Sequence, residues 1–254
     1  TKADPMNGQA WDLSNPRVQS RVMKMVMETK PSFLIGSPPC TAFSTMQNIS
    51  KHKRDPKVVA AELEAGRVHL RFCMKLYALQ IKEGRFFVHE HPDQAASWAE
   101  SYVVEMMAMS GVDLAIVDMC ALGMRVDTGS VQGPARKRTK IMSNSQEVLK
   151  RIAISCPNSG PDTTLHHVHV PLEQGRAKRC QVFPRQFSRT ICEGIAAERR
   201  LRELGMVAIP IMSIGDDMAE GNKAAGELHE PDGTQATDDQ SGEPLLPAVS
   251  YTHL

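Results

Sequence analysis

The sequence predicts an α/β fold, in which a mostly parallel β-sheet is covered by helices on both faces. Two observations support this prediction. Short apolar segments of strand length alternate with longer segments whose apolar residues recur at helical spacing. The chain has 254 residues, of which 41% are hydrophobic, so it is long enough to bury one sizeable core. Such alternation is typical of parallel strands joined by helices.

The first predicted unit is a helix followed by a strand. Asn15 and Pro16 are a typical helix cap and first helical residue, and Pro31 ends this helix. The apolar segment 33–35 then predicts a short buried strand that ends at Gly36. A Gly- and Pro-rich turn follows, which in a parallel sheet lies at the carboxyl edge, where ligands bind.

A second, long helix is predicted to start at Asp55 and Pro56 and to end near Gly84. The remaining elements follow from the same periodicities. Further strands are predicted at 85–89, 114–117, 139–142 and 207–212, and further helices at 99–109 and 184–204. We expect these elements to form one domain, residues 1–212.

Residues 213–254 differ from this domain in composition. Within them, residues 216–243 hold nine acidic side chains and one lysine, with few large apolar residues. Such a segment buries too little apolar surface to offset the entropy of ordering, so we expect an acidic disordered tail. The net charge of this segment is −8, so the formal net charge of +1 leaves +9 on the rest of the chain. A basic body suits a nucleic-acid partner, although it is also common in proteins that bind none.

The cysteines predict the redox environment of the protein, and the start of the sequence predicts that the domain belongs to a longer polypeptide. No two of the six cysteines are spaced as Cys-x-x-Cys, and no signal peptide precedes them. We therefore expect free thiols in a reducing intracellular environment. No apolar run reaches the roughly 18 residues of a spanning helix, so we expect no membrane association. The first residue is Thr and the motifs begin almost at once, which predicts a monomeric domain within a longer polypeptide.

Residues 36–44, Gly-Ser-Pro-Pro-Cys-Thr-Ala-Phe-Ser, follow the first strand. Two consecutive prolines stiffen the backbone and remove two amide donors, so they aim the next side chain, Cys40. A structural turn with a buried cysteine is the alternative. The segment resembles the Pro-Pro-Cys motif of cytosine-5 DNA methyltransferases, where Gly-Gly-Pro-Pro-Cys-Gln-x-Phe-Ser is usual. Ser37 and Thr41 depart from that pattern.

A second match lies in residues 86–92, an apolar strand that ends in a carboxylate. Glu90 matches the acid of the family's Glu-Asn-Val motif, whereas His91 and Pro92 depart from it. A glutamate at the carboxyl end of a strand is well placed for a site. The alternative is a strand end that simply exits to solvent.

The resemblance implies a Rossmann-like, S-adenosylmethionine-dependent methyltransferase fold that acts on DNA. Cys40 is then the nucleophile that adds to carbon 6 of cytosine and makes carbon 5 enamine-like. Glu90 supplies a proton or a hydrogen bond at N3 and the exocyclic amine. Carbon 5 takes the methyl group of S-adenosylmethionine after the base has been flipped out of the duplex. A DNA substrate places the protein in the nucleus, or wherever that DNA resides.

The third match is a basic segment. Residues 134–142, after Gly123, resemble the region of the family's Gln-x-Arg-x-Arg motif, in which one arginine helps to hold the cytosine and the glutamate. The glutamine is missing, and Arg136 and Arg138 compete for the role, of which we rank Arg138 first. A solvated basic turn or a phosphate contact is the alternative.

Two residues are expected at the cofactor. Asp12, within Trp11-Asp12-Leu13, stands where the family places an aspartate that contacts the adenine, although it equally suits a turn. Pro39 is the second expected contact. The family's first motif, a strand followed by Phe-x-Gly-x-Gly, is absent from the sequence. We therefore expect an N-terminally truncated domain with an incomplete cofactor site.

Other chemistry remains as an alternative. Cys156, His166, His167 and His169 are residue types that bind zinc, but Cys156 and His166 are ten residues apart and no further pair of ligands is evident. We therefore predict loop histidines and no metal.

The resemblance spans residues 12–144 and is closest to divergent forms in polyproteins of mobile elements and viruses. The two rival functions are a catalytically inactive nucleic-acid-binding module and a cysteine hydrolase that uses Cys40 with His89 or His91.

Overall fold

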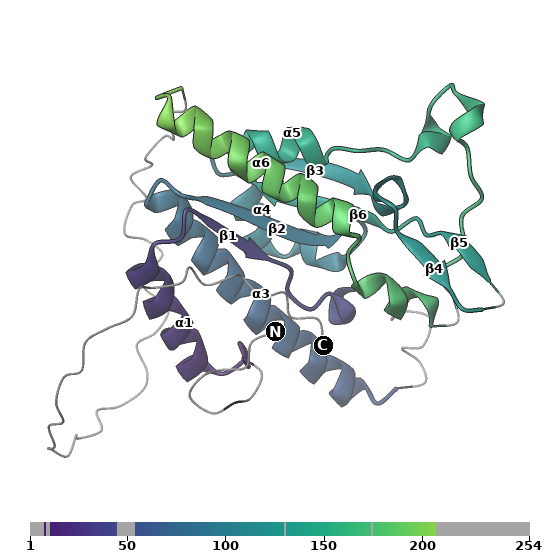
Figure 1. Cartoon of the computed structure of the whole chain (residues 1–254). Helices are drawn as coiled ribbons and strands as arrows, with labels where there is room; N and C mark the ends of the chain where they lie inside the picture. The colour runs from purple at the N-terminus through teal and green to yellow at the C-terminus, as the bar shows by residue number, and fades with distance from the viewer. Residues whose placement is uncertain (1–7, 9–10, 45–53, 130, 174, 207–254) are drawn as a thin grey trace, which may run out of the picture.

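The computed structural model describes residues 8, 11–44, 54–129, 131–173 and 175–206 (Figure 1). The strand predicted at 207–212 and the acidic tail predicted at 213–254 lie outside these residues. None of the helices in the described part of the chain has the length and apolar character needed to cross a membrane.

The centre of the fold is a mixed four-stranded sheet with the strand order β1-β2-β6-β3. The strands are β1 (Phe33–Gly36), β2 (Phe86–Pro92), β3 (Asp113–Asp118) and β6 (Arg138–Ser143). β1 pairs with β2 in parallel, whereas β6 runs antiparallel to both of its neighbours, β2 and β3. The predicted α/β class is confirmed, but the prediction of a mostly parallel sheet is wrong for the pairings of β6.

The connections explain these strand directions. The long helix α3 (Pro56–Lys82) lies between β1 and β2, so the chain returns to the starting edge and the two strands are parallel. The described residues between β3 and β6 contain no crossover helix. They instead form a short hairpin, β4 (Arg125–Asp127) and β5 (Gln132–Pro134), and the chain comes back beside β3, with Asp118 opposite Arg138. A direct return of this kind gives antiparallel strands.

Helices cover both faces of the sheet, as predicted (Figure 1). On one face, Phe87 and Met142 pack against α3 and α4 (Ser101–Met107). On the other face, Val88 and Ile141 pack against α5 (Gln146–Ile152) and α6 (Arg185–Glu203). The helix α1 (Pro16–Thr29) packs on the outside of α3.

Local sequence signals explain where the two N-terminal helices begin. The side chain of Asn15 accepts a hydrogen bond from the amide of Arg17, and Asp55 does the same for Lys57. Each cap is followed by a proline, which has no amide hydrogen to leave unpaired at the helix start. These predicted boundaries are confirmed.

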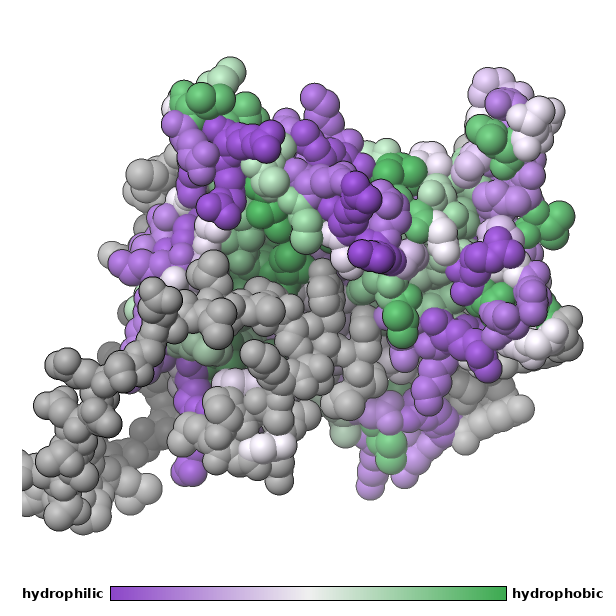
Figure 2. Space-filling view, in the orientation of Figure 1, coloured by the Kyte–Doolittle hydropathy of each residue, from purple (hydrophilic) through white to green (hydrophobic). Residues whose placement is uncertain are grey.

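The outer face of α6 is polar and basic. Figure 2 shows hydrophilic side chains gathered over this helix, and its exposed residues include Arg185, Arg189, Arg199 and Arg200. The inner face is apolar, with Phe187 and Ile191 buried against the sheet. This division is that of an amphipathic surface helix.

Candidate active site

The turn that carries Cys40 leaves β1 at the edge of the sheet. Pro38 is buried, and Cys40 is half-buried. A single 3₁₀ turn, Thr41–Phe43, follows, in which the amide of Phe43 donates to the carbonyl of Cys40 (3.0 Å). The Phe43 side chain is only 2% exposed and belongs to the core on the α3 side of the sheet. Cys40 is thus held between a stiff Pro-Pro segment and a buried aromatic anchor.

Glu90 lies inside β2 and is 4% exposed, so the alternative in which it marks a strand end in solvent is wrong. Its carboxylate has two partners. Ser37 donates its hydroxyl to Oε2 (2.5 Å), and Lys137 places its ammonium 3.4 Å from Oε1. A buried carboxylate needs such partners because the loss of water is otherwise costly.

His91 fastens the same turn from the other face of β2. Its Nε2 lies 2.9 Å from the carbonyl oxygen of Pro38, and its Nδ1 lies 2.6 Å from the hydroxyl of Ser97. A carbonyl only accepts, so Nε2 donates, and a neutral Nδ1 accepts from Ser97. Burial lowers the pKa of His91, although the charge of Glu90 opposes this shift. Ser37 and His91, two of the four departures from the family pattern, therefore clamp the Cys40 turn to β2 from both sides.

The charges around Cys40 act on its thiol in opposite directions. Burial raises the pKa of Cys40 above its ordinary value of 9.0, the charge of Glu90 raises it further, and the charge of Lys137 lowers it. The thiol is consequently protonated at neutral pH in the free protein. Lys137 favours the thiolate, which is the nucleophilic form.

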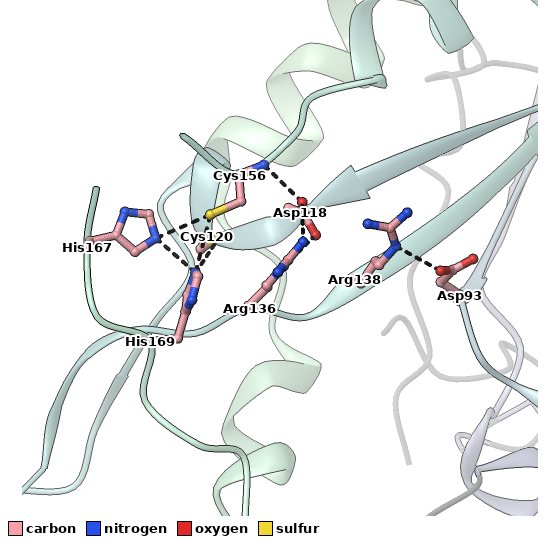
Figure 3. A network of polar contacts seen from close by, with 8 residues as sticks. All are labelled: Asp93, Asp118, Cys120, Arg136, Arg138, Cys156, His167 and His169. Carbon is pink, nitrogen blue, oxygen red and sulfur yellow. Dashed lines mark hydrogen bonds and ion pairs between the residues drawn. The ribbon is translucent and has the colours of Figure 1, made fainter. Parts of the chain in front are cut away.

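Neither candidate arginine pairs with Glu90. Arg138 binds Asp93 (Nε to Oδ2, 2.9 Å), and Arg136 binds Asp118 (Nε to Oδ1, 3.1 Å), as Figure 3 shows. The basic partner of Glu90 is Lys137, between them in the sequence. Successive residues of a strand face opposite sides of the sheet, so Arg138, the first residue of β6, faces the side opposite to Ile141, which is the register partner of Glu90. The ranking of Arg138 as the residue that holds the glutamate is corrected to Lys137.

The two residues expected at S-adenosylmethionine do not by themselves fit that cofactor. Asp12 is exposed, and its Oδ1 accepts hydrogen bonds from the amide (3.0 Å) and the hydroxyl (2.6 Å) of Ser14. These bonds lower the pKa of Asp12 and make it a turn residue at the start of α1. Pro39 has no amide hydrogen and brings only its ring and carbonyl to this edge.

A second group of polar side chains lies apart from the turn of Cys40. The thiols of Cys120 and Cys156 and the imidazoles of His167 and His169 converge at one point (Figure 3). His166 is not a member, since its Nε2 instead lies 3.1 Å from the carbonyl of Gly160. The spacing of the C-terminal residues does not suggest Cys120, which comes from the short turn after β3.

The chain matches no protein-family model, no curated protein and no solved structure. What the site can do is therefore inferred from its own residues.

Proposed function

We propose that this chain carries the base-activating part of a cytosine-5 DNA methyltransferase domain, with Cys40 as the nucleophile. The observation that carries the proposal is the arrangement around the Pro-Pro-Cys turn. A half-buried thiol follows a strand, and beside it lies a buried carboxylate, Glu90, paired with a lysine. A nucleophile, a hydrogen-bond acceptor and a positive charge are the groups that addition to cytosine requires.

Each group has a distinct role toward a flipped cytosine. The Cys40 thiolate forms a bond to carbon 6, and the electron pair of the 5,6 double bond moves into the ring. Glu90 accepts a hydrogen bond from the exocyclic amine or, once protonated, donates one at N3. Lys137 balances the negative charge that develops on the ring and lowers the pKa of the attacking thiol. Once carbon 5 carries a methyl group, loss of its proton expels Cys40 and restores the 5,6 double bond.

The methyl donor in this proposal is S-adenosylmethionine, which supplies an electrophilic methyl group to carbon 5. Because Asp12 and Pro39 do not fit it alone, Cys40, Glu90 and Lys137 are assigned roles toward the base only. These roles do not depend on how the donor is held.

The hydrolase alternative needs a free base beside Cys40. His91 uses both ring nitrogens on Pro38 and Ser97. His89 is 1% exposed, its Nδ1 lies 3.1 Å from the hydroxyl of Tyr77, and burial holds its pKa well below the usual value. A histidine committed to other partners does not serve as the base of a catalytic dyad.

The nucleic-acid-binding alternative is supported by the exposed arginines of α6, which suit phosphate groups. One experiment separates it from the proposal. The chain is incubated with S-adenosylmethionine and a pool of duplexes in which 5-fluorocytosine replaces cytosine, because fluorine at carbon 5 blocks the final elimination and leaves Cys40 attached.

We expect a denaturant-resistant DNA adduct that is absent from Cys40→Ser. Cys192→Ser is the matched control, because Cys192 is an exposed cysteine on α6. DNA retention by the native protein without an adduct would contradict methyl transfer by this chain and favour the inactive module.

A further inference from the structure

Four side chains converge where the loop after α5 meets the end of β3. They are Cys120, Cys156, His167 and His169, and their ligand atoms all lie within 4.8 Å of one another. Both cysteines are buried, and both histidines are half-buried. Among the described residues, no other group of three or more His, Cys, Asp or Glu side chains meets in this way.

The spacing of these atoms is that of a tetrahedral zinc site. Zinc bonds of about 2.3 Å to sulfur and about 2.0 Å to nitrogen place neighbouring ligand atoms about 3.3 to 3.8 Å apart. The Nε2 of His169 lies 3.4 Å from the thiol of Cys156 and 3.3 Å from that of Cys120. The Nε2 of His167 lies 3.7 Å from the thiol of Cys156 and 2.9 Å from the Nε2 of His169. Each of these four distances is within a few tenths of an ångström of the tetrahedral value, and all six distances among the ligand atoms are within 4.8 Å.

Hydrogen bonds alone do not account for the convergence. The Nε2 of His169 has three neighbours, which are two thiols and the other imidazole nitrogen. An imidazole nitrogen has either one hydrogen to donate or one lone pair to accept with, so it satisfies one of the three. A cation at the centre uses the lone pairs of all four ligands at once.

We propose that Cys120, Cys156, His167 and His169 bind one Zn²⁺ ion. Two thiolates and two imidazoles are a donor set that favours zinc over the oxygen-seeking Mg²⁺ and Ca²⁺. Four protein ligands leave no position for substrate or water, so the site is structural. The inference does not depend on the proposed function, because none of these residues takes part in the chemistry assigned to Cys40.

The surrounding contacts hold the ligands in place. Asp118 accepts a hydrogen bond from the backbone amide of Cys156 (2.9 Å) and is itself paired with Arg136 (Figure 3). Asn158 exchanges two hydrogen bonds with the backbone of His167, at 2.7 and 2.9 Å. Such outer contacts orient the ligands of metal sites.

The site explains how a long irregular segment is held to the domain. Between α5 and α6 the described chain forms only short 3₁₀ turns, and Leu165 and Val168 are 59% and 89% exposed. A segment with so little apolar burial gains order from a metal cross-link. The cross-link ends at Cys120, next to Met119, whose amide donates to the carbonyl of Lys137 (3.1 Å). Zinc binding thus braces the backbone that presents Lys137 to Glu90.

The test is metal stoichiometry measured on the full chain. Protein is purified, supplied with zinc, passed through a desalting column and measured by elemental analysis. We expect one zinc per chain for the unaltered protein, and a fall towards zero for His167→Asn and Cys156→Ser. His166→Asn and Cys192→Ser are the matched controls and should keep one zinc per chain.

Cobalt provides a second readout that needs no variant. The unaltered chain with Co²⁺ should show the intense visible bands of a tetrahedral site and a thiolate-to-cobalt charge-transfer band. A chain that retains no zinc, a cobalt spectrum without thiolate charge transfer, or a His166→Asn variant that loses zinc as His167→Asn does would each overturn the proposal. If the ligand variants do not fold, the cobalt spectrum of the unaltered chain decides.

Discussion

At the scale of single residues, the reactivity of Cys40 depends on two opposite charges. Burial and the charge of Glu90 raise the pKa of its thiol, and the charge of Lys137 lowers it. The two charged side chains are themselves paired, at 3.4 Å, and both are largely buried. Low solvent exposure leaves these interactions little screened, so single substitutions should move the pKa of Cys40 measurably.

We predict that Glu90→Gln lowers the pKa of Cys40, because it removes a negative charge, and that Lys137→Met raises it, because it removes a positive charge. The measurement is the pH dependence of Cys40 alkylation by iodoacetamide, followed by mass spectrometry of the peptide that contains Cys40. Arg138→Met is the matched control, since Arg138 is paired with Asp93, and should leave the midpoint unchanged. Midpoints that move in the same direction for both variants would contradict these roles of the two charges.

The comparison of Cys40 and Glu90 with Lys137 shows what sequence alone can predict at this scale. Cys40 and Glu90 stand in local motifs, so their types and spacing are sufficient to single them out. Lys137 lies in a run of three basic residues, Arg136 to Arg138, and the residue types alone do not show which of the three side chains reaches Glu90. The answer depends on how the chain before β6 is placed against β2, and so on the register of these two strands, which is a long-range property. Cys120 escapes prediction for a similar reason, because its partners are distant in sequence.

At the scale of elements, the close approach of α3 to β1 positions the start of the Cys40 turn. Gly36 ends β1, and a Cβ atom at this position would lie 1.9 Å from the hydroxyl oxygen of Tyr77 and 3.1 Å from its Cζ. That hydroxyl hydrogen-bonds to His89 on β2. A glycine is therefore required where the helix, the two strands and the turn meet.

We predict that Gly36→Ala destabilises the domain by about 1–3 kcal/mol, because the tyrosine hydroxyl must move out of its place. Tyr77→Phe removes the clashing oxygen at a cost of about 1 kcal/mol for the lost hydrogen bond. The double variant should be more stable than the sum of the two single effects by about 1 kcal/mol, as measured by urea unfolding. Simple additivity would show that the contact between Gly36 and Tyr77 does not set this geometry.

Elements are predictable in proportion to their length. The long helix α3 and the helix α6 have many apolar positions at one spacing and clear boundaries. The helix α5 has seven residues, and β4 and β5 have three each, too few for a period to be visible. The direction of β6 differs from the prediction because it depends on the connection from β3, and not on the residues of β6 itself.

At the scale of the whole molecule, the buried histidines His89 and His91 and the half-buried His69 make the stability of the domain sensitive to acid. Burial lowers the pKa of His69 to about 4, and it lowers the pKa values of His89 and His91 as well. In the unfolded chain these imidazoles return to a pKa of about 6.5. The unfolded state then binds more protons than the folded state at mildly acidic pH, so stability falls as the pH falls.

We predict that the free energy of unfolding decreases between pH 7.5 and 5, with His69 contributing about 1–2 kcal/mol of that loss. The loss begins near the unfolded pKa and, for His69, ends near pH 4. The measurement is urea unfolding at several pH values for the unaltered chain and for His69→Gln, which should depend less steeply on pH. Parallel pH profiles for the two proteins would show that His69 is not buried in its neutral form.

The proposed addition of Cys40 to carbon 6 of a pyrimidine held beside Glu90 has a direct test that requires no methyl donor. The chain is mixed with duplexes in which 2-pyrimidinone replaces cytosine, since this base is open to thiolate addition at carbon 6 and forms a long-lived adduct. The products are digested and mapped by mass spectrometry. We expect the pyrimidinone nucleotide on Cys40, in the unaltered chain and in Cys192→Ser, and no adduct in Cys40→Ser. Bound DNA with Cys40 unmodified, or an adduct on another cysteine, would contradict the assignment of Cys40 as the nucleophile.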